Sequence, residues 1–493
     1  MNDRTIIKKL NERRLAFMVM FVVLSLLSSV MVINAPLNVD RLFCWGTLFI
    51  VVANLVLVCL LKLGEPKPIN WVSAELIFST SFIIVHFLYI FMWLTEVFYL
   101  GQEIWYFKTG NYPHVVCKTL SMCAGCLSAF NMGYIFIKYR VRVAPLKPVA
   151  KWQSLGKLLV RFSMAMLTAF IFVVGVGRFW GGIYTGSNFG FGASILLALF
   201  QGLVVASICV LIVSRTSMTF GRGMKGGVLW FDLLLAIGAS LAVLLHGDRS
   251  TFLIIVLAVV ASYSEFVKPL KLRTAALAFF GLFVLLGVSG LARHASEGRS
   301  IASFYRIAVE TGDDSIEYAM KSFSGSVLTA FIATDYVPSN HPYFMGQLKT
   351  NSLAGLIPFG RKLFGVRQDI DSDTAMLFTY LVHGKVGRDV AGAGTSVFAD
   401  IYLEGGYWFT LVCFFMMGCL FKTISEKAKS TDNLLWKVGL ICLIAVSCIS
   451  GRMAILNLLI RQVAYPVMYV GFIAWLIGVR IRASSYVAVH PKM

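Results

Sequence analysis

Twelve long apolar stretches run along the chain, separated by polar connections, and this pattern limits its fold more than any other feature. Each stretch is close to the ~17–25 residues that one helix needs to cross a bilayer. Backbone groups inside lipid must be satisfied within the segment, so these stretches are expected to be helices. We predict an all-α, polytopic membrane helix bundle of about 12 transmembrane helices with one large outer loop, the spans lying near residues 15–33, 42–61, 72–94, 117–137, 158–177, 188–214, 226–246, 250–266, 273–291, 396–421, 434–450 and 453–479.

Composition and charge place the chain in a membrane. Hydrophobic residues make up 58% of the chain and charged residues 14%, whereas soluble domains carry roughly 25% charge. The formal net charge is +20, and its basic residues collect in alternate connections and at both termini, which is the positive-inside signature. We therefore predict a multi-pass membrane protein with N- and C-termini in the cytoplasm, in contact with anionic membrane lipid and not with nucleic acid.

The chain divides into three parts. Residues 1–291 form a transmembrane bundle with spans 1–9, residues 292–395 a large outer loop, and residues 396–493 spans 10–12 with a cytoplasmic tail. A loop of this length is uncommon without structure of its own. We expect short helices near 300–310, 314–333 and 373–382, the last opened by a capping aspartate, Asp371 or Asp373.

Arginines near the outer ends of the spans are the anomaly in this sequence, because the positive-inside rule places basic residues on the other side. The candidates for substrate binding are Arg178, Arg249, Arg293, Arg299, Arg361, Arg388 and Arg452, with Arg461 about two turns inside the last expected span. Snorkelling to the interface or pairing with a nearby acid is the alternative for each of them.

Arg249 stands in the shortest outer connection, in the sequence HGDRST. Gly247 allows a tight turn there, and Asp248 is expected to cap the helix that follows. The connection is too short to wander, so the Arg249 side chain either lies at the headgroup level or points into the bundle.

Several arginines at one membrane surface suit a pyrophosphate, because a guanidinium binds phosphate oxygens in pairs and stays charged. Sugar transfer from a lipid-linked diphosphate also requires a base for the acceptor hydroxyl. The catalytic candidates are His294, which stands between two arginines that favour its neutral form, and Asp400 and Glu404, which share one face of a helix. For the two carboxylates, a salt bridge inside the bundle is the alternative.

No cofactor is expected. The sequence DIDSD at residues 369–373 resembles the start of a calcium loop, but Thr374 replaces the required Gly and Tyr380 the required Glu. Phosphate-binding and zinc-binding motifs are absent from the sequence.

Three stretches, HGDRSTFLI, IPFGRKLFG and GAGTSVFADIYLEGGYWFTL, together with the topology, resemble the bacterial O-antigen polymerase family. The similarity runs over roughly residues 225–425. It implies an enzyme of the bacterial inner membrane, without metal or nucleotide, that polymerises glycan repeat units carried on undecaprenyl pyrophosphate at the periplasmic face. The acceptor would be one repeat unit on the same carrier, and a flippase and a chain-length regulator would be partners. Outer arginines are the family's functional residues, which by position implies Arg249, Arg293, Arg299, Arg361 and Arg388.

Two other readings remain open. The related O-antigen ligases place a histidine before a hydrophobic-Glu-x-Gly helix, but here Thr395 and Ser396 stand at that place. A transporter or flippase would carry unusual charges on both sides of the bilayer, whereas this sequence concentrates them on one side.

Overall fold

The computed structural model describes residues 3–64, 69–96, 106–107, 110–111, 113–138, 150–180, 191–218, 227–278, 281, 324–357, 360–366, 372–385 and 392–481. Its elements are α1 (Asp3–Ile33), α2 (Arg41–Leu63), α3 (Ala74–Leu94), β1 (Tyr106–Phe107), β2 (Gly110–Asn111), α4 (Pro113–Phe136), α5 (Ala150–Val174), α6 (Val176–Trp180), α7 (Phe191–Met218), α8 (Gly227–His246), α9 (Arg249–Phe266), α13 (Val327–Tyr336), α14 (Gln347–Leu356), α15 (Gly360–Leu363), α16 (Thr374–His383), α17 (Val397–Ser430), α18 (Leu434–Ser447), η3 (Ser450–Arg452), η4 (Asn457–Ala464) and α19 (Tyr465–Leu476).

The predicted helical membrane bundle is confirmed in its architecture. Within the described residues, nine helices are long and apolar enough to cross a membrane, fewer than the twelve predicted. Phe231–Leu244 of α8 and the whole of α18 form shorter apolar helices, and the expected span 273–291 lies mostly outside the described residues. The small antiparallel hairpin of β1 and β2 was not expected from the sequence.

Polar caps explain where several spans begin. The side chains of Asp40, Ser396 and Asn433 accept hydrogen bonds from the backbone nitrogens of Phe43 (2.6 Å), Ala399 (3.2 Å) and Leu435 (2.9 Å), at the starts of α2, α17 and α18. Such caps satisfy backbone N–H groups that have no partner inside the helix.

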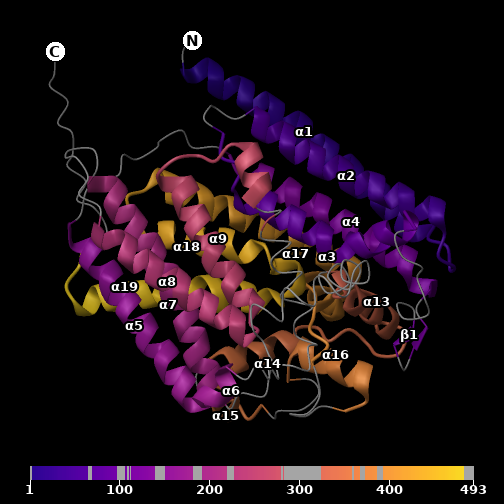
Figure 1. The fold of residues 1–493 in the computed structure, drawn as a ribbon. Coiled ribbons are helices and arrows are strands. Elements are labelled where there is room, and N and C mark those ends of the chain that lie inside the picture. The colour runs from indigo at the N-terminus through magenta and orange to yellow at the C-terminus, as the bar shows by residue number, and fades with distance from the viewer. Residues whose placement is uncertain are drawn as a thin grey trace.

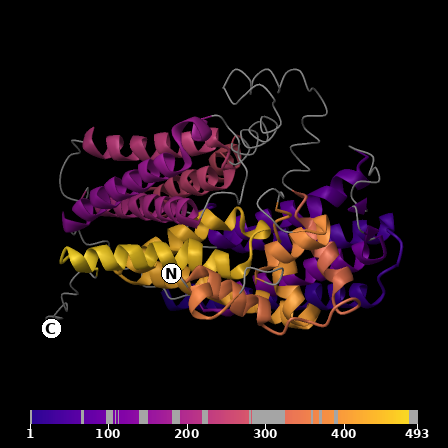
Figure 2. The same ribbon diagram turned by 90° about the horizontal axis from the view of Figure 1, so that it is seen from below.

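Two groups of helices pack among themselves. The first consists of α1, α2, α3, α4 and α17, and the second of α5, α7 and α8. Figure 1 shows α1, α2 and α4 running together along one edge, with α13 to α16 gathered at the end of the bundle opposite the N-terminus. Figure 2 shows the magenta helices of residues 150–246 as a layer over the yellow C-terminal helices. Helix α7 packs on α9, α18 and α19, which join the two groups.

Glycines bring α4 and α17 into backbone contact. A Cβ atom added at Gly418 would overlap the Phe130 carbonyl and lie 2.7 Å from the Tyr134 nitrogen. A Cβ at Gly133 would meet the Phe415 backbone in the same way. Small residues at such crossings allow the close approach on which helix association in lipid depends.

The described part of residues 292–395, the range predicted as the outer loop, contains several short helices. Helix α16 confirms the helix expected at 373–382, and Asp373 is its cap, accepting from the Met376 nitrogen at 2.9 Å. Helix α13 overlaps the end of the range expected at 314–333, whereas the range 300–310 lies outside the described residues. Helix α14 was not expected from the sequence.

Candidate functional site

A cavity of about 820 Å³ lies between the two helix groups, lined by α2, α3, α9, η4 and the corner between α18 and η4. Its volume is in the range of ~300–1,000 Å³ that small-molecule sites occupy. Three arginines and one carboxylate line it, together with several neutral polar side chains. The charged lining residues are Asp248, Arg249, Arg452 and Arg461.

The Asp248–Arg249 turn takes the form that the sequence predicts. Gly247 has a φ of 108°, which L-residues with a side chain rarely adopt. Asp248 accepts hydrogen bonds from the backbone nitrogens of Ser250 and Thr251, both at 3.1 Å, and from the Thr251 hydroxyl at 2.6 Å. Its capping role is therefore confirmed, and it places Arg249 as the first residue of α9, on the cavity wall.

Arg452 reaches the same cavity because α18 is short. The Ser81 hydroxyl donates to the Cys448 carbonyl at 2.7 Å, and Gly451 packs against Val85. These contacts place the corner after α18 level with the middle of α3, inside the bundle. Arg452 Nε donates to the Ser326 hydroxyl at 3.0 Å, which links the cavity to the residue just before α13.

Arg461 and its neighbour Gln462 both line the cavity although they are adjacent in sequence. They lie in the π-helix η4, which continues into α19. Pro466 has no N–H, and its ring conflicts with the carbonyl four residues earlier, that of Gln462, so regular α-turns are disfavoured here. Wide π-turns of this kind occur often at functional sites.

The remaining walls are mostly apolar, so the cavity has a cationic part and a hydrophobic part. The apolar lining comes chiefly from α2, α3, α9 and residues 272–276, and includes Leu55, Trp71, Leu76, Ile77, Ile84, Val85, Leu253, Ile254, Leu272 and Ala275. Guanidinium groups bind phosphate oxygens with paired hydrogen bonds. The arrangement therefore suits a molecule with a phosphorylated head and an apolar chain.

Asp400 and Glu404 are buried on one face of α17, as predicted. Their carboxylate oxygens accept hydrogen bonds from other residues of the protein. Asp400 accepts from Lys349 Nζ and the Ile455 nitrogen, at 2.7 and 2.9 Å, and from the Thr374 hydroxyl. Glu404 accepts from the backbone nitrogens of Gly346 (2.6 Å) and Lys349 (3.1 Å), and its Oε1 lies 3.4 Å from Lys349 Nζ.

These contacts correspond to the salt bridge considered as the alternative for the two carboxylates. Neither residue is among those that line the cavity. Through Ile455, however, Asp400 holds the chain segment between Arg452 and η4. Asp400 thus connects α14, α16 and α17 to the segment that follows Arg452.

The other predicted site residues divide into two sets. Arg178 is exposed on α6, and Arg361 pairs with Asp373 at 3.4 Å on α15, so the cavity lining includes neither. The rest lie outside the described residues, namely Arg293, His294, Arg299 and Arg388. Of the seven arginines predicted, the structure brings Arg249 and Arg452 together.

Sequence reasoning did not select the partners of these residues. Lys349 lies in a segment that reads as irregular, and Gln462 gives no signal of its own. Arg461 does give a signal, because a charged residue within an apolar span usually faces a cavity or a partner. Among the described residues, no three His, Cys, Asp or Glu side chains come together to hold a metal ion.

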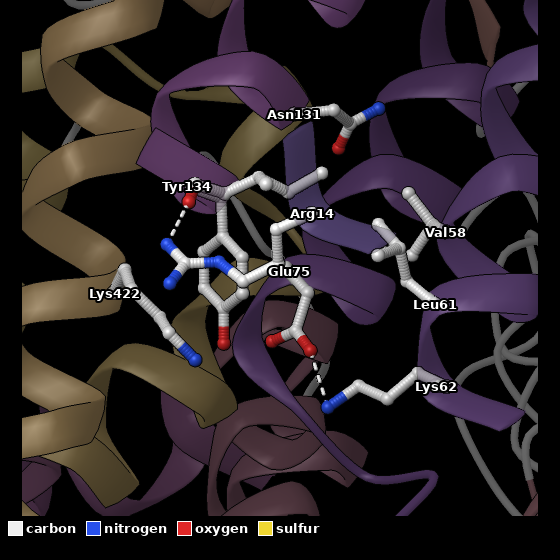
Figure 3. Close-up of a pocket in the computed structure, with 9 residues that line it drawn as sticks. Arg14, Val58, Leu61, Lys62, Glu75, Asn131, Tyr134 and Lys422 are labelled. Carbon is white, nitrogen blue, oxygen red and sulfur yellow. Dashed lines mark hydrogen bonds and ion pairs between the residues drawn. The ribbon is translucent and has the colours of Figure 1, made fainter. Parts of the chain in front are cut away.

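A second, much smaller cavity of about 30 Å³ lies at the end of the bundle that holds the N-terminus (Figure 3). Lys62 Nζ lies 2.5 Å from a Glu75 oxygen, Lys422 pairs with Glu426 at 2.9 Å, and Arg14 donates to the carbonyls of Ile135 and Ile137. The space holds about one water molecule. We interpret this cluster as a set of ion pairs and hydrogen bonds that hold α1, α2, α3, α4 and α17 together.

The comparisons with known proteins find one family model, which covers slightly less than half of the chain. Residues 243–477 match a family described as a domain of unknown function, DUF8712. Comparison with curated proteins and with solved structures finds no match. The matched range begins at the end of α8 and ends after α19, so it includes the three cavity arginines and Asp400.

Proposed function

We propose that this chain is a membrane glycosyltransferase that polymerises oligosaccharide repeat units carried on undecaprenyl pyrophosphate, producing O-antigen or a related surface polysaccharide. The observation that supports this proposal best is the cavity with Arg249, Arg452 and Arg461 on its wall and apolar residues over the rest. A polyprenyl diphosphate has both of the chemical features that this lining suits.

In this proposal the arginines hold the diphosphate and stabilise it as it leaves. When the glycosidic bond to the carrier breaks, negative charge builds up on the departing diphosphate. Fixed guanidinium groups in a site with little water stabilise that charge strongly. Arg249 and Arg452 come from elements far apart in sequence, so the site is formed only when α9 packs against α18.

The apolar walls hold the part of the isoprenoid chain next to the diphosphate, and the glycan extends toward the outer loop. Of the three candidates for the base, we propose His294, since Asp400 and Glu404 accept hydrogen bonds from Lys349 and from backbone nitrogens. No metal or nucleotide takes part in this proposal. A flippase and a chain-length regulator of the same pathway are the proposed partners.

The proposed location is the bacterial inner membrane, with both termini in the cytoplasm and the cavity arginines nearer the periplasmic side. The basic residues at both chain termini and in alternate connections support this orientation, because the positive-inside rule places them in the cytoplasm. Lys429 lies 3.8 Å from Glu265, and Trp152 donates to the Arg480 carbonyl at 2.9 Å. The Leu434 nitrogen, just after α17, donates to the Ile481 carbonyl at 3.2 Å and links these two pairs, so the inner ends predicted for four spans lie close together.

The test is the surface polysaccharide ladder of a strain that lacks this gene and carries wild type, Arg249→Ala or Arg249→Lys. The proposal expects the ladder to collapse to core plus one repeat unit with Arg249→Ala, and Arg249→Lys to restore it only in part. Arg41→Ala is the matched control, because Arg41 is exposed, pairs with Glu96 and lies away from the cavity.

Loss of even the single repeat unit would indicate ligation or flipping instead. A normal ladder with Arg249→Ala would contradict the proposed role of the cavity.

A further inference from the structure

The segment formed by α14, α15 and the residues beside them, called here the α14–α15 segment (residues 345–357 and 360–366), has an unusually apolar surface. Five large apolar side chains on it are exposed, Met345 by 81%, Leu353 by 41%, Ile357 by 40%, Leu363 by 75% and Phe364 by 65%. Arg361 and Lys362 lie among them in sequence. Exposed apolar patches of this kind mark contacts with other proteins or with membranes.

One end of this segment is hydrogen-bonded to α17, which is itself long and apolar enough to span a membrane. The backbone of α17 breaks at Gly405 and Gly406, and Gly406 has a φ of 73°. The break frees the carbonyls of Leu403 and Glu404, which would otherwise accept bonds within the helix. They accept instead from the backbone nitrogens of Phe344 and Met345, both at 3.0 Å.

The other end is attached to α19. The Tyr465 hydroxyl donates to the Leu356 carbonyl at 2.5 Å, and Tyr465 is the first residue of α19. Helix α14 therefore runs across the end of the bundle from one spanning helix to another. Figure 1 places α14 and α15 together at that end, opposite the N-terminus.

Both spanning helices expose apolar side chains next to these attachment points. On α17, Trp408 is exposed by 66% and Phe409 by 47%, about one turn beyond the break. On α19, Met468 is exposed by 62%, one turn beyond Tyr465. The exposed surface of the α14–α15 segment is thus continuous with surface that a bilayer covers.

We propose that the α14–α15 segment lies in the bilayer interface on the side of the α17 N-terminus, with Met345, Leu363 and Phe364 among the acyl chains. Lys362, which is exposed, then lies at the level of the lipid phosphates, where basic residues are attracted to anionic headgroups. The partner is the lipid surface itself, and the inference does not depend on the proposed glycan chemistry.

Photocrosslinking of the full chain tests this inference. The variant Phe364→p-benzoylphenylalanine keeps an aromatic side chain at an exposed position, and Leu363→p-benzoylphenylalanine provides a second site. Each protein is reconstituted in vesicles of phosphatidylethanolamine and phosphatidylglycerol, irradiated and analysed by mass spectrometry. The matched control is Asn340→p-benzoylphenylalanine, at an exposed polar position outside this segment.

The inference expects phospholipid adducts at positions 363 and 364 at least tenfold above those at 340. Equal lipid adducts at the three positions would overturn it. Crosslinks from 363 and 364 to a second copy of the chain, without lipid adducts, would overturn it as well and indicate a protein interface.

Discussion

Replacing Gly418 by alanine should loosen the contact between α4 and α17. The new Cβ would lie 2.7 Å from the Tyr134 nitrogen, whereas ordinary contacts begin at 3.4 Å. The Tyr134 nitrogen and the Phe130 carbonyl, which the Cβ would also meet, are backbone atoms of α4, a helix that is almost entirely buried. No side chain can therefore move aside to make room. The two helices would have to separate by at least about 0.7 Å.

Overpacking of this kind lowers the free energy of unfolding by about 1–3 kcal/mol. The matched control is Gly439→Ala in α18, where the new Cβ would lie 3.5 Å from a Val467 methyl group. A glycine-to-alanine change inside a helix with room for the methyl group stabilises by up to about 1 kcal/mol. The two variants should therefore shift stability in opposite directions.

The assay is the thermal unfolding midpoint of the purified protein in one detergent, read from the monodisperse fraction after heating. The midpoint should fall for Gly418→Ala and stay or rise for Gly439→Ala. If the two midpoints changed alike, the backbone contact between α4 and α17 would not be as described.

Three further changes probe the described contacts. Glu75→Gln leaves Lys62 buried without its charged partner and should lower the free energy of unfolding by about 3 kcal/mol or more. Adding Lys62→Met should recover most of this loss. Equal thermal unfolding midpoints for the single and the double variant would contradict the prediction. Asp248→Ala removes the α9 cap and should cost about 1 kcal/mol, with Asp248→Asn near wild type in the same thermal assay. Asp400→Ala should release Lys349 of α14 and Thr374 of α16, which would be seen as faster limited proteolysis of residues 340–385. An unchanged digestion rate would contradict this role of Asp400.

The local features of the fold follow from the sequence because they depend on neighbouring residues. Asp248 and Asp373 cap helices where the pattern predicts, and Gly247 has the positive φ that a two-residue turn requires. The spans follow from length and apolarity. Helix α14 could not be predicted, because its sequence carries few apolar residues and contacts with Glu404 and Tyr465 hold it in place.

The candidate site could be predicted only in part, because it is formed by tertiary packing. The arginines near the predicted outer ends of the spans stand out in the sequence. Nothing local, however, shows that Arg249 and Arg452 share a cavity and that Arg178 and Arg361 do not line it. The shared face of Asp400 and Glu404 follows from their spacing. Their partner Lys349 lies 51 residues away from Asp400 and could not be found from the pattern.

Binding of a polyprenyl diphosphate tests the central claim most directly. Purified wild type, Arg249→Ala, Arg452→Ala and the control Arg41→Ala are placed in nanodiscs, and their affinities for farnesyl diphosphate and farnesol are measured. Hydrogen bonds to charged groups contribute about 1.5–3 kcal/mol each, or roughly tenfold or more in affinity. The account predicts that wild type and Arg41→Ala bind the diphosphate and not the alcohol, and that each cavity variant binds it at least tenfold more weakly. Equal affinity in all four proteins would contradict the account.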